Sequence, residues 1–209
     1  NFSNLSDCSS PTNPLTFDLT INETEALNGQ DPNNYTVFYY DNPTDAANND
    51  INNAVQNPTN FEVINTGITT VYVNVQNNIS QDCFTGDSFE IEVFQTPDIT
   101  TPPQNLSTCG DFTGTQTFNL EIYDASALGI ANPTEVLITY HNTQGDADTG
   151  GNPISPADNY QPSNAQEDIF IRAENINDAT CFSTTSFSIE IFNVEIPPPP
   201  LALDLESCD

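Results

Sequence analysis

The sequence has no lysine, methionine or tryptophan, and Arg172 is its single basic side chain. Without lysine the chain cannot form a Schiff base, use a P-loop lysine or close a lysine–asparagine isopeptide bond. Charge-driven binding of nucleic acid or anionic lipid needs Lys and Arg side chains that displace counterions. We therefore expect no nucleic-acid partner.

Long apolar runs are missing as well. A membrane-spanning helix requires about 18 or more consecutive apolar residues, and the sequence has no such run. Direct membrane insertion is therefore not expected. The chain starts at Asn1 with no charged-then-apolar leader, which predicts an interior or mature part of a longer protein whose targeting signal lies elsewhere.

Acidic residues dominate the charge, because 30 Asp and Glu in 209 residues give a formal net charge of −29. High net charge is one signature of disorder. However, 36% of the residues are hydrophobic and 10% are aromatic, and they alternate with polar residues along short runs. This pattern favours a folded, acidic, β-rich protein.

The cysteines mark an internal repeat. Cys8, Cys109 and Cys208 end three similar segments, LSDC, LSTC and LESC, which lie about 100 residues apart. Other matches keep the same order, for example SFEIEVF at 88–94 and SFSIEIF at 186–192. The sequence therefore predicts three parts, which are a first repeat at 1–103, a second at 104–200 and the first strand of a following repeat at 201–209. Both full repeats end in a Pro-rich linker, 96–103 and 196–200, which we expect to be extended and semi-rigid.

The same repeat suggests how the cysteines pair. Each repeat has one Cys near its start and one about 75 residues later, so we predict the disulfides Cys8–Cys83 and Cys109–Cys181. Cys208 would then pair with a cysteine beyond the end or in another chain. Disulfides indicate an oxidising, extracellular compartment. A metal site made by these cysteines is disfavoured, because no CxxC occurs and only His141 could assist.

Period-two alternation predicts β-strands. Phe89, Ile91 and Val93 alternate with Glu90 and Glu92, and the matching run at 186–192 alternates in the same way. About seven short strands per repeat predict an all-β fold with two tandem immunoglobulin-like β-sandwich domains of about 100 residues each. Only 24–27 and 124–128 are expected to form helical turns. By the same alternation Arg172 should face outward, near Glu190.

The motif order resembles a known family. The pattern C…TF(D/N)L…AL…YxVxYY…DA…NP…VYVxVxN…CF…SFxIxVF…P covers essentially all of the chain. It is similar to the Ig-like tandem repeats of giant Bacteroidetes cell-surface adhesins of the gliding-motility type, which are type IX secretion system cargo. The resemblance implies a secreted or outer-membrane-attached protein in which such repeats mostly act as spacers.

Enzymatic chemistry has little support. His141 is the only histidine and ends the predicted strand 136–141, and its counterpart in the first repeat is Tyr40. Catalysis needs several convergent groups, so we expect a solvated histidine and no enzyme.

Two acidic segments are candidates for Ca²⁺, the only cofactor that the sequence suggests. Asp146 and Asp148 lie at alternate positions before two glycines in 144–152, which is half of a calcium loop. The matching segment 41–50 offers Asp41, Asp45 and Asp50. Neither segment has the downstream Glu of an EF-hand, and ordinary acidic turns have the same composition. Both interpretations stay open.

The leading hypothesis for function is a non-catalytic spacer or stalk segment of a long adhesin, whose partners are neighbouring repeats of the same polypeptide or filament. One alternative is a binding module that engages Ca²⁺, a glycan or a surface ligand directly, through the acidic loops or exposed aromatic rings. Another is an extracellular filament subunit in which 201–209 completes the sheet of a neighbouring molecule. Cys208 would then be intermolecular.

Overall fold

The structure is a computed structural model that describes residues 2–9, 14–110 and 112–193. The linker 196–200, the segment 201–209 and Cys208 lie outside the described residues. Contacts group the chain into two compact units, of which the first comprises Asn1–Thr100, Gly129–Ile138 and Ala173–Ser183, and the second comprises Thr101–Leu128, Thr139–Arg172 and Thr184–Asp209. The first unit thus combines the first sequence repeat with two segments of the second. Contacts between those two segments and residues up to 100 therefore lie within one unit.

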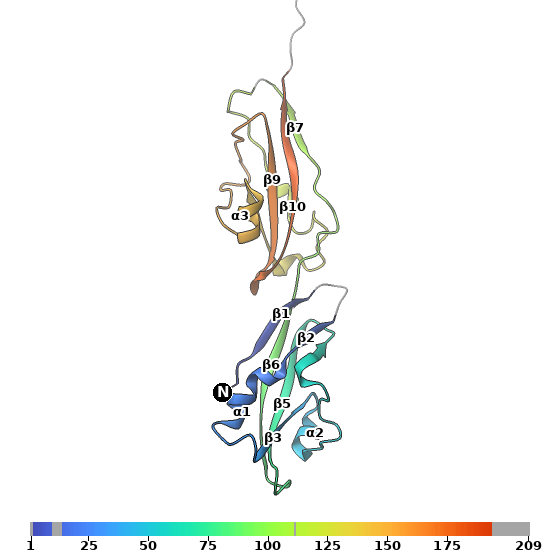
Figure 1. Cartoon of the computed structure of the whole chain (residues 1–209). Coiled ribbons are helices and arrows are strands. Elements are labelled where there is room, and N and C mark those ends of the chain that lie inside the picture. Colours follow the sequence, from blue (N-terminus) through green and yellow to red (C-terminus); the bar gives the residue numbers. More distant parts are fainter. Residues whose placement is uncertain (1, 10–13, 111, 194–209) are drawn as a thin grey trace, which may run out of the picture. The chain divides into compact units, whose positions relative to one another are not determined.

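A four-stranded sheet forms the main layer of the first repeat (Figure 1). Its order is β1 (Leu5–Ser9), β6 (Phe84–Gln95), β5 (Gly67–Asn77) and β3 (Tyr35–Tyr40). Strand β1 runs parallel to β6, whereas β5 is antiparallel to both β6 and β3. The parallel register places Leu5 beside Ile91 and Ser9 beside Gln95. Strands β1 and β6 therefore finish at the same end of the sheet.

The second layer of this repeat is short. Strands β2 (Leu15–Phe17) and β4 (Phe61–Val63) pair in antiparallel fashion. Phe17 and Val63 pack in one core cluster with buried residues of the main sheet, such as Val71 and Ile91. Burying one such side chain contributes about 1.5–3 kcal/mol to folding.

The opposite face of the sheet is covered by helix α2 (Pro43–Asn48), where Ala46 packs against Tyr40. The other helical segments of this repeat are η1 (Leu19–Asn22), α1 (Glu23–Leu27) and η2 (Pro58–Asn60). Helix α1 lies where a helical turn was expected at 24–27.

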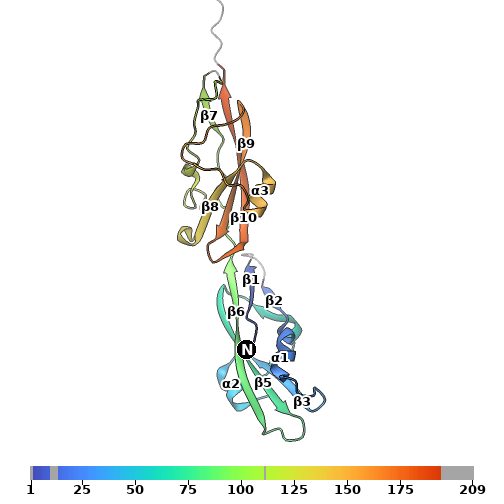
Figure 2. The same ribbon diagram turned by 90° about the vertical axis from the view of Figure 1, so that its left-hand side faces the viewer.

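The second repeat has the same strand order (Figure 2), which is β7 (Leu106–Cys109), β10 (Asp178–Phe192), β9 (Gln166–Asn175) and β8 (Val136–His141). Strand β7 runs parallel to β10, and Cys109 lies beside Phe192. A single antiparallel bridge between Phe118 and Tyr160 stands at the place of the β2–β4 pair. The helical segments are η3 (Glu121–Tyr123), η4 (Pro133–Glu135) and α3 (Gln144–Thr149).

The predicted fold is confirmed: both repeats are immunoglobulin-like, mostly β, and arranged in tandem. The residues predicted to face inward are buried, including Phe89, Ile91 and Val93 in β6 and Phe187, Ile189 and Ile191 in β10. The helical turn predicted at 124–128 is present too, since the N–H of Leu128 donates to the carbonyl oxygen of Asp124 at 3.0 Å, directly after the 3₁₀ helix η3. No helix in the described part of the chain is long and apolar enough to cross a membrane.

Candidate functional site

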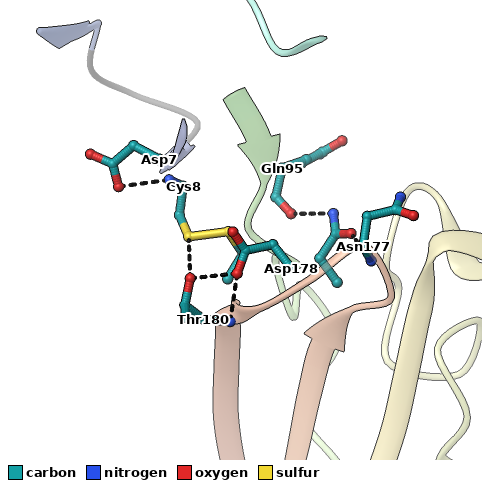
Figure 3. Close-up of a disulfide and its surroundings, with 8 residues drawn as sticks. Asp7, Cys8, Gln95, Asn177, Asp178 and Thr180 are labelled. Carbon is teal, nitrogen blue, oxygen red and sulfur yellow. Dashed lines mark hydrogen bonds between the residues drawn. A yellow bond between two sulfur atoms is a disulfide. The ribbon is translucent and has the colours of Figure 1, made fainter. Parts of the chain in front are cut away.

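A disulfide joins the first repeat to the second, between Cys8 at the end of β1 and Cys181 near the start of β10 (Figure 3). The two Cα atoms are 5.3 Å apart and 173 residues separate the cysteines in the sequence. Cys181 is fully buried. The Thr180 hydroxyl lies 3.6 Å from the Cys8 sulfur and donates a 2.6 Å hydrogen bond to Asp178 Oδ1, which fixes the turn beside the disulfide.

The predicted pairs Cys8–Cys83 and Cys109–Cys181 are wrong in this structure. Cys83 and Cys109 are free and exposed. The reason is the parallel pairing of β1 with β6, which sets Cys8 beside Phe94, 11 residues (94 − 83) along the strand from Cys83. At about 3.3 Å per residue, those two cysteines lie roughly 35 Å apart, whereas a disulfide requires Cα atoms within about 7 Å.

Cys109 and Cys181 are separated in the same way, because Cys109 lies beside Phe192, again 11 residues (192 − 181) from Cys181. Within each repeat, therefore, one cysteine sits at each end of the sheet. Cys208 lies outside the described residues, and its pairing stays a prediction.

Hydrogen bonds within the first unit surround the disulfide. Asn175 Nδ2 donates to the carbonyl oxygen of Gln95 at 3.0 Å, and the Ser183 hydroxyl donates to that of Pro97 at 2.6 Å. Asn132 Nδ2 also donates to Gln95 Oε1, at 3.1 Å. Figure 3 shows Gln95 beside the hairpin that carries Cys181. The start of the linker is thus held by side chains from the β9–β10 hairpin and from the loop before β8.

The candidate calcium segment 144–152 is a short helix rather than a loop. Thr143 accepts a hydrogen bond from the backbone N–H of Asp146, and α3 ends at Gly150, whose φ of 69° is the left-handed conformation that glycine adopts readily. The Asp146 carboxylate accepts hydrogen bonds from the Thr143 hydroxyl and from Asn152 Nδ2. These two bonds, that from Thr143 first, lower the pKa of Asp146. Asp148 accepts a bond from Gln144 Nε2.

The matching segment 41–50 contains helix α2. Asn42 caps it by accepting from the N–H of Thr44. Asp45 and Asp50 both accept hydrogen bonds from the side-chain amide of Asn53, while Asp41 is exposed. Among the described residues, the structure brings no three His, Cys, Asp or Glu side chains together as a metal site would need. Both segments thus contain short capped helices, and calcium binding by their aspartates stays a prediction.

Arg172 is buried, with 4% of its surface exposed, so the prediction that it faces solvent is wrong, while its proximity to Glu190 stays a prediction. Its Nη1 donates to the carbonyl oxygens of Ala147 and Asp148, at 3.0 Å each. A cation at the C-terminal end of a helix meets carbonyl groups that lack partners within the helix. Helix α3 covers this face of β9, which the alternation alone assigned to solvent.

His141 is buried as well, with none of its surface exposed, and the expectation of a solvated histidine was wrong. Its Nδ1 lies 2.7 Å from the carbonyl oxygen of Gly151, and its Nε2 lies 2.9 Å from the Thr139 hydroxyl. Both ring nitrogens thus have partners inside the protein. This arrangement positions the loop after α3 and leaves no ring nitrogen directed at solvent.

An open hollow of about 360 Å³ lies beside α2 in the first repeat. Tyr72, Phe84 and Ala46 contribute to its lining, and Phe84 is 38% exposed. Aromatic rings at such a hollow could stack on a sugar. This hollow therefore bears on the alternative hypothesis that the chain is a glycan-binding module.

A family model described as the Flavobacterium inter-domain disulphide bond domain matches residues 4–97 and again residues 105–197. The predicted kinship with Ig-like tandem repeats of Bacteroidetes is thereby confirmed. No curated protein shows a significant match to the sequence.

Several solved structures show distant similarity. Sidekick-1 immunoglobulin domains 1–4 are 9% identical, with 92% of this chain and 51% of that chain covered and a TM-score of 0.30. The I-band fragment I67–I69 of titin is 10% identical, with 77% and 55% covered and a TM-score of 0.34. Human mucin-like protocadherin EC1-2 is 9% identical, with 91% and 94% covered and a TM-score of 0.28. The chain thus spans about half the length of the Sidekick-1 and titin chains.

Proposed function

The chain belongs to the family of Flavobacterium inter-domain disulphide bond domains, and on that basis we propose that it is a load-bearing spacer of a secreted or cell-surface adhesin. In this proposal the two repeats hold a binding region away from the cell and perform no catalysis. The observation that carries it is the Cys8–Cys181 disulfide, which connects the two repeats by a second covalent route.

The position of this disulfide supports a mechanical role. A pull on the two ends of the chain passes from Cys8 through the sulfur atoms to Cys181, and the 172 residues between them (173 − 1) are bypassed. Hydrogen bonds between strands contribute about 1 kcal/mol each and can break one after another, whereas the covalent link persists in an oxidising medium. Asn175 further holds the last residue of β6, Gln95, and Ser183 holds Pro97 in the linker that follows.

A replacement experiment tests the spacer function. In cells that display the protein containing this chain, residues 1–200 are exchanged for an unrelated pair of rigid Ig-like domains with an equivalent inter-domain disulfide. A spacer is defined by its length and stiffness, so we expect attachment to surfaces to be retained. Loss of attachment, with surface display unchanged, would show that these repeats carry a binding function of their own.

The glycan-binding alternative is examined with the isolated chain. Binding to a glycan array that is lost in Phe84→Ala, and kept in a control that changes the half-buried Phe170→Ala, would favour the hollow beside α2 as a ligand site. If the chain binds no glycan on the array, the result supports the spacer function.

A further inference from the structure

Asn28 and Gly29 form the only Asn-Gly pair in the sequence. Asn28 directly follows helix α1 and has a φ of 46° and a ψ of 42°, which is the left-handed conformation that often ends a helix. Asparagine tolerates this conformation better than most residues that have a side chain. Both residues of the pair are exposed to solvent. The end of α1 therefore displays an asparagine amide next to a glycine.

An asparagine followed by glycine is chemically labile. The backbone nitrogen of the following residue attacks Cγ of the asparagine, a cyclic succinimide forms and ammonia leaves. Water then opens the ring at either carbonyl group, which gives aspartate or isoaspartate. The sum of the reaction consumes one water and releases one ammonia, with no oxidant, reductant or enzyme. Its rate depends on a free backbone nitrogen and a free side chain.

Asn28 meets both requirements. Among the described residues, neither the N–H of Gly29 nor the side-chain amide of Asn28 has a hydrogen-bond partner. Gly29 has no Cβ to obstruct the attack, and apart from its neighbours in the chain no atom lies within 4 Å of the place where a Cβ would stand. The attack requires rotation of the chain between the two residues, which breaks the 2.8 Å hydrogen bond from the N–H of Gln30 to the carbonyl oxygen of Leu27.

Asn49 is a matched asparagine in the same repeat. It ends helix α2 with a φ of 47°. However, its Oδ1 accepts hydrogen bonds from the Tyr40 hydroxyl at 3.2 Å and from Asn74 Nδ2 at 3.0 Å. The N–H of the next residue, Asp50, donates to the carbonyl oxygen of Asp45 at 3.0 Å. Because the side chain and the attacking nitrogen are both held, the fold protects Asn49 from this reaction.

Two further positions lack one of the reacting groups. Asn152 has a φ of 45°, but Pro153 follows it and has no N–H that could attack. In the second repeat the counterpart of Asn28 is Gly129, which has a φ of 70° and no side chain to react. Among the described residues, Asn28 is therefore the only asparagine in the left-handed conformation whose surroundings permit the reaction.

We propose that Asn28 is a site of spontaneous deamidation in the folded protein, at which the chain gains a negative charge with time. The reaction requires no partner and is independent of the spacer function. The new carboxylate lies at the C-terminal end of α1, where the helix dipole disfavours a negative charge and where Glu23 and Glu25 are already near. Isoaspartate also lengthens the backbone by a methylene group. The end of α1 should therefore open more often once Asn28 has reacted.

The first test incubates the folded 209-residue chain at neutral pH, with a parallel sample in urea. Cleavage after Glu25 and Glu62 gives a peptide, 26–62, that contains both Asn28 and Asn49, so that one fragmentation spectrum measures both. Each conversion raises the mass by about 1 Da, because NH₂ is replaced by OH. Since one backbone hydrogen bond opposes the attack, the rate at Asn28 in the folded chain should be at most about tenfold below its rate in urea.

Asn49 should stay intact in the folded chain over the same time. If Asn28 also stays intact in the folded chain while it reacts in urea, or if Asn49 reacts as fast as Asn28 in the folded chain, the proposal is overturned. The rate at Asn28 should rise with hydroxide concentration, because the nitrogen of Gly29 attacks after losing its proton.

The control variant is Asn28→Gly, which removes the amide and keeps the backbone conformation that Gly129 has in the second repeat. The unaltered chain should slowly give a more acidic species on ion exchange, and Asn28→Gly should not. Acidic species that form equally fast in both chains would place the reaction at other residues and refute the proposal.

A second test examines the end of α1. The reacted chain is separated by ion exchange, and hydrogen–deuterium exchange is compared with that of fresh chain. Exchange at the N–H of Gln30 should be faster after the reaction, whereas Asn28→Gly that has been incubated for the same time should match its fresh sample. Equal exchange in reacted and fresh chains would refute the expected opening of α1.

Discussion

Arg172 Nη1 lies 3.0 Å from the carbonyl oxygen of Ala147, at the C-terminal end of helix α3. The only Arg or Lys side chain of a chain with a net charge of −29 is thus buried and bound to a helix end. In the first repeat the equivalent position holds Asn74, whose Nδ2 donates to the carbonyl oxygen of Ala46 at 2.7 Å. Asn74 therefore binds α2 to the sheet of the first repeat, and Arg172 binds α3 to that of the second.

We expect Arg172→Ala to lower the free energy of unfolding by about 2–3 kcal/mol, because two buried carbonyl groups lose a charged donor. Arg172→Lys keeps the charge but lacks the planar fork of donors, so its loss should be smaller. Chemical unfolding followed by circular dichroism measures both variants. Equal losses in the two variants would mean that packing of the side chain, rather than the hydrogen bonds, stabilises α3.

Cys8→Ser should strongly increase the length released when single molecules are pulled from both ends. With the disulfide intact only 37 residues (209 − 172) can extend, which gives at most about 130 Å at 3.6 Å per residue, whereas the variant can release about 750 Å. The matched control is Cys109→Ser, which removes a free cysteine and should leave the extension unchanged. Similar extensions for Cys8→Ser and the unaltered chain would show that the Cys8–Cys181 disulfide does not bear the load.

The same Cys8→Ser variant should also be less stable, by about 2–5 kcal/mol, because a cross-link that closes a long loop restricts the unfolded chain. Thermal unfolding with and without a reductant measures this effect. Reduction should destabilise the unaltered chain and leave Cys8→Ser unaffected.

Tyr39 and Tyr140 occupy equivalent positions and offer a matched pair of substitutions. The Tyr140 hydroxyl donates to the carbonyl oxygen of Tyr123 at 3.1 Å, whereas the buried Tyr39 hydroxyl has no hydrogen-bond partner among the described residues. We expect Tyr140→Phe to lower the free energy of unfolding by about 1 kcal/mol, and Tyr39→Phe to leave it unchanged or raise it by about 1 kcal/mol. A loss of equal size in both variants would contradict this assignment.

High pH should unfold the protein through its buried phenols. Burial, and then nearby carboxylates, raise the pKa of Tyr39 and Tyr140 above the ordinary value, and burial together with Glu167 does the same for Tyr160. Since the folded-state pKa is the higher one, this contribution to stability is complete below about pH 10 and is lost as the pH rises further. Urea unfolding at increasing pH measures the decline.

The pH experiment needs two controls. A Cys83→Ser, Cys109→Ser background removes the free thiols whose exchange would disturb the disulfide at high pH. Adding Tyr39→Phe and Tyr140→Phe should make the decline shallower. If the slope stays the same, other groups cause the alkaline unfolding.

The alternation of apolar residues was enough to predict the strands and their buried faces, as Ile91 and Ile189 illustrate. It could not give the direction of the opening strand, because a period of two is the same in parallel and antiparallel pairs. The cysteine pairing depends on that direction. The repeat located all four cysteines of the described region, but which ends of the sheet they occupy follows only from the partners of β1 and β7.

The starts of helices α2 and α3 have local sequence signals for a helix, although both segments are rich in Asp and resemble acidic turns. Asn42 followed by Pro43 is typical of a helix start, and Thr143 three residues before Asp146 resembles a capping box. Without these helices the sequence predicts exposed positions for Arg172 on β9 and for His141 at the end of β8. Burial of a strand's polar face depends on tertiary covering elements, which alternation along one strand does not contain.

The linker after β6 is exposed at Asp98 and Thr101, and such segments are preferred sites of proteolytic cleavage. Because Cys8 and Cys181 flank it, a protease that cuts the backbone there produces two fragments that remain attached through sulfur. A surface protein built in this way would tolerate a nick without shedding the part beyond it. Shedding would require a cut and a reducing agent together.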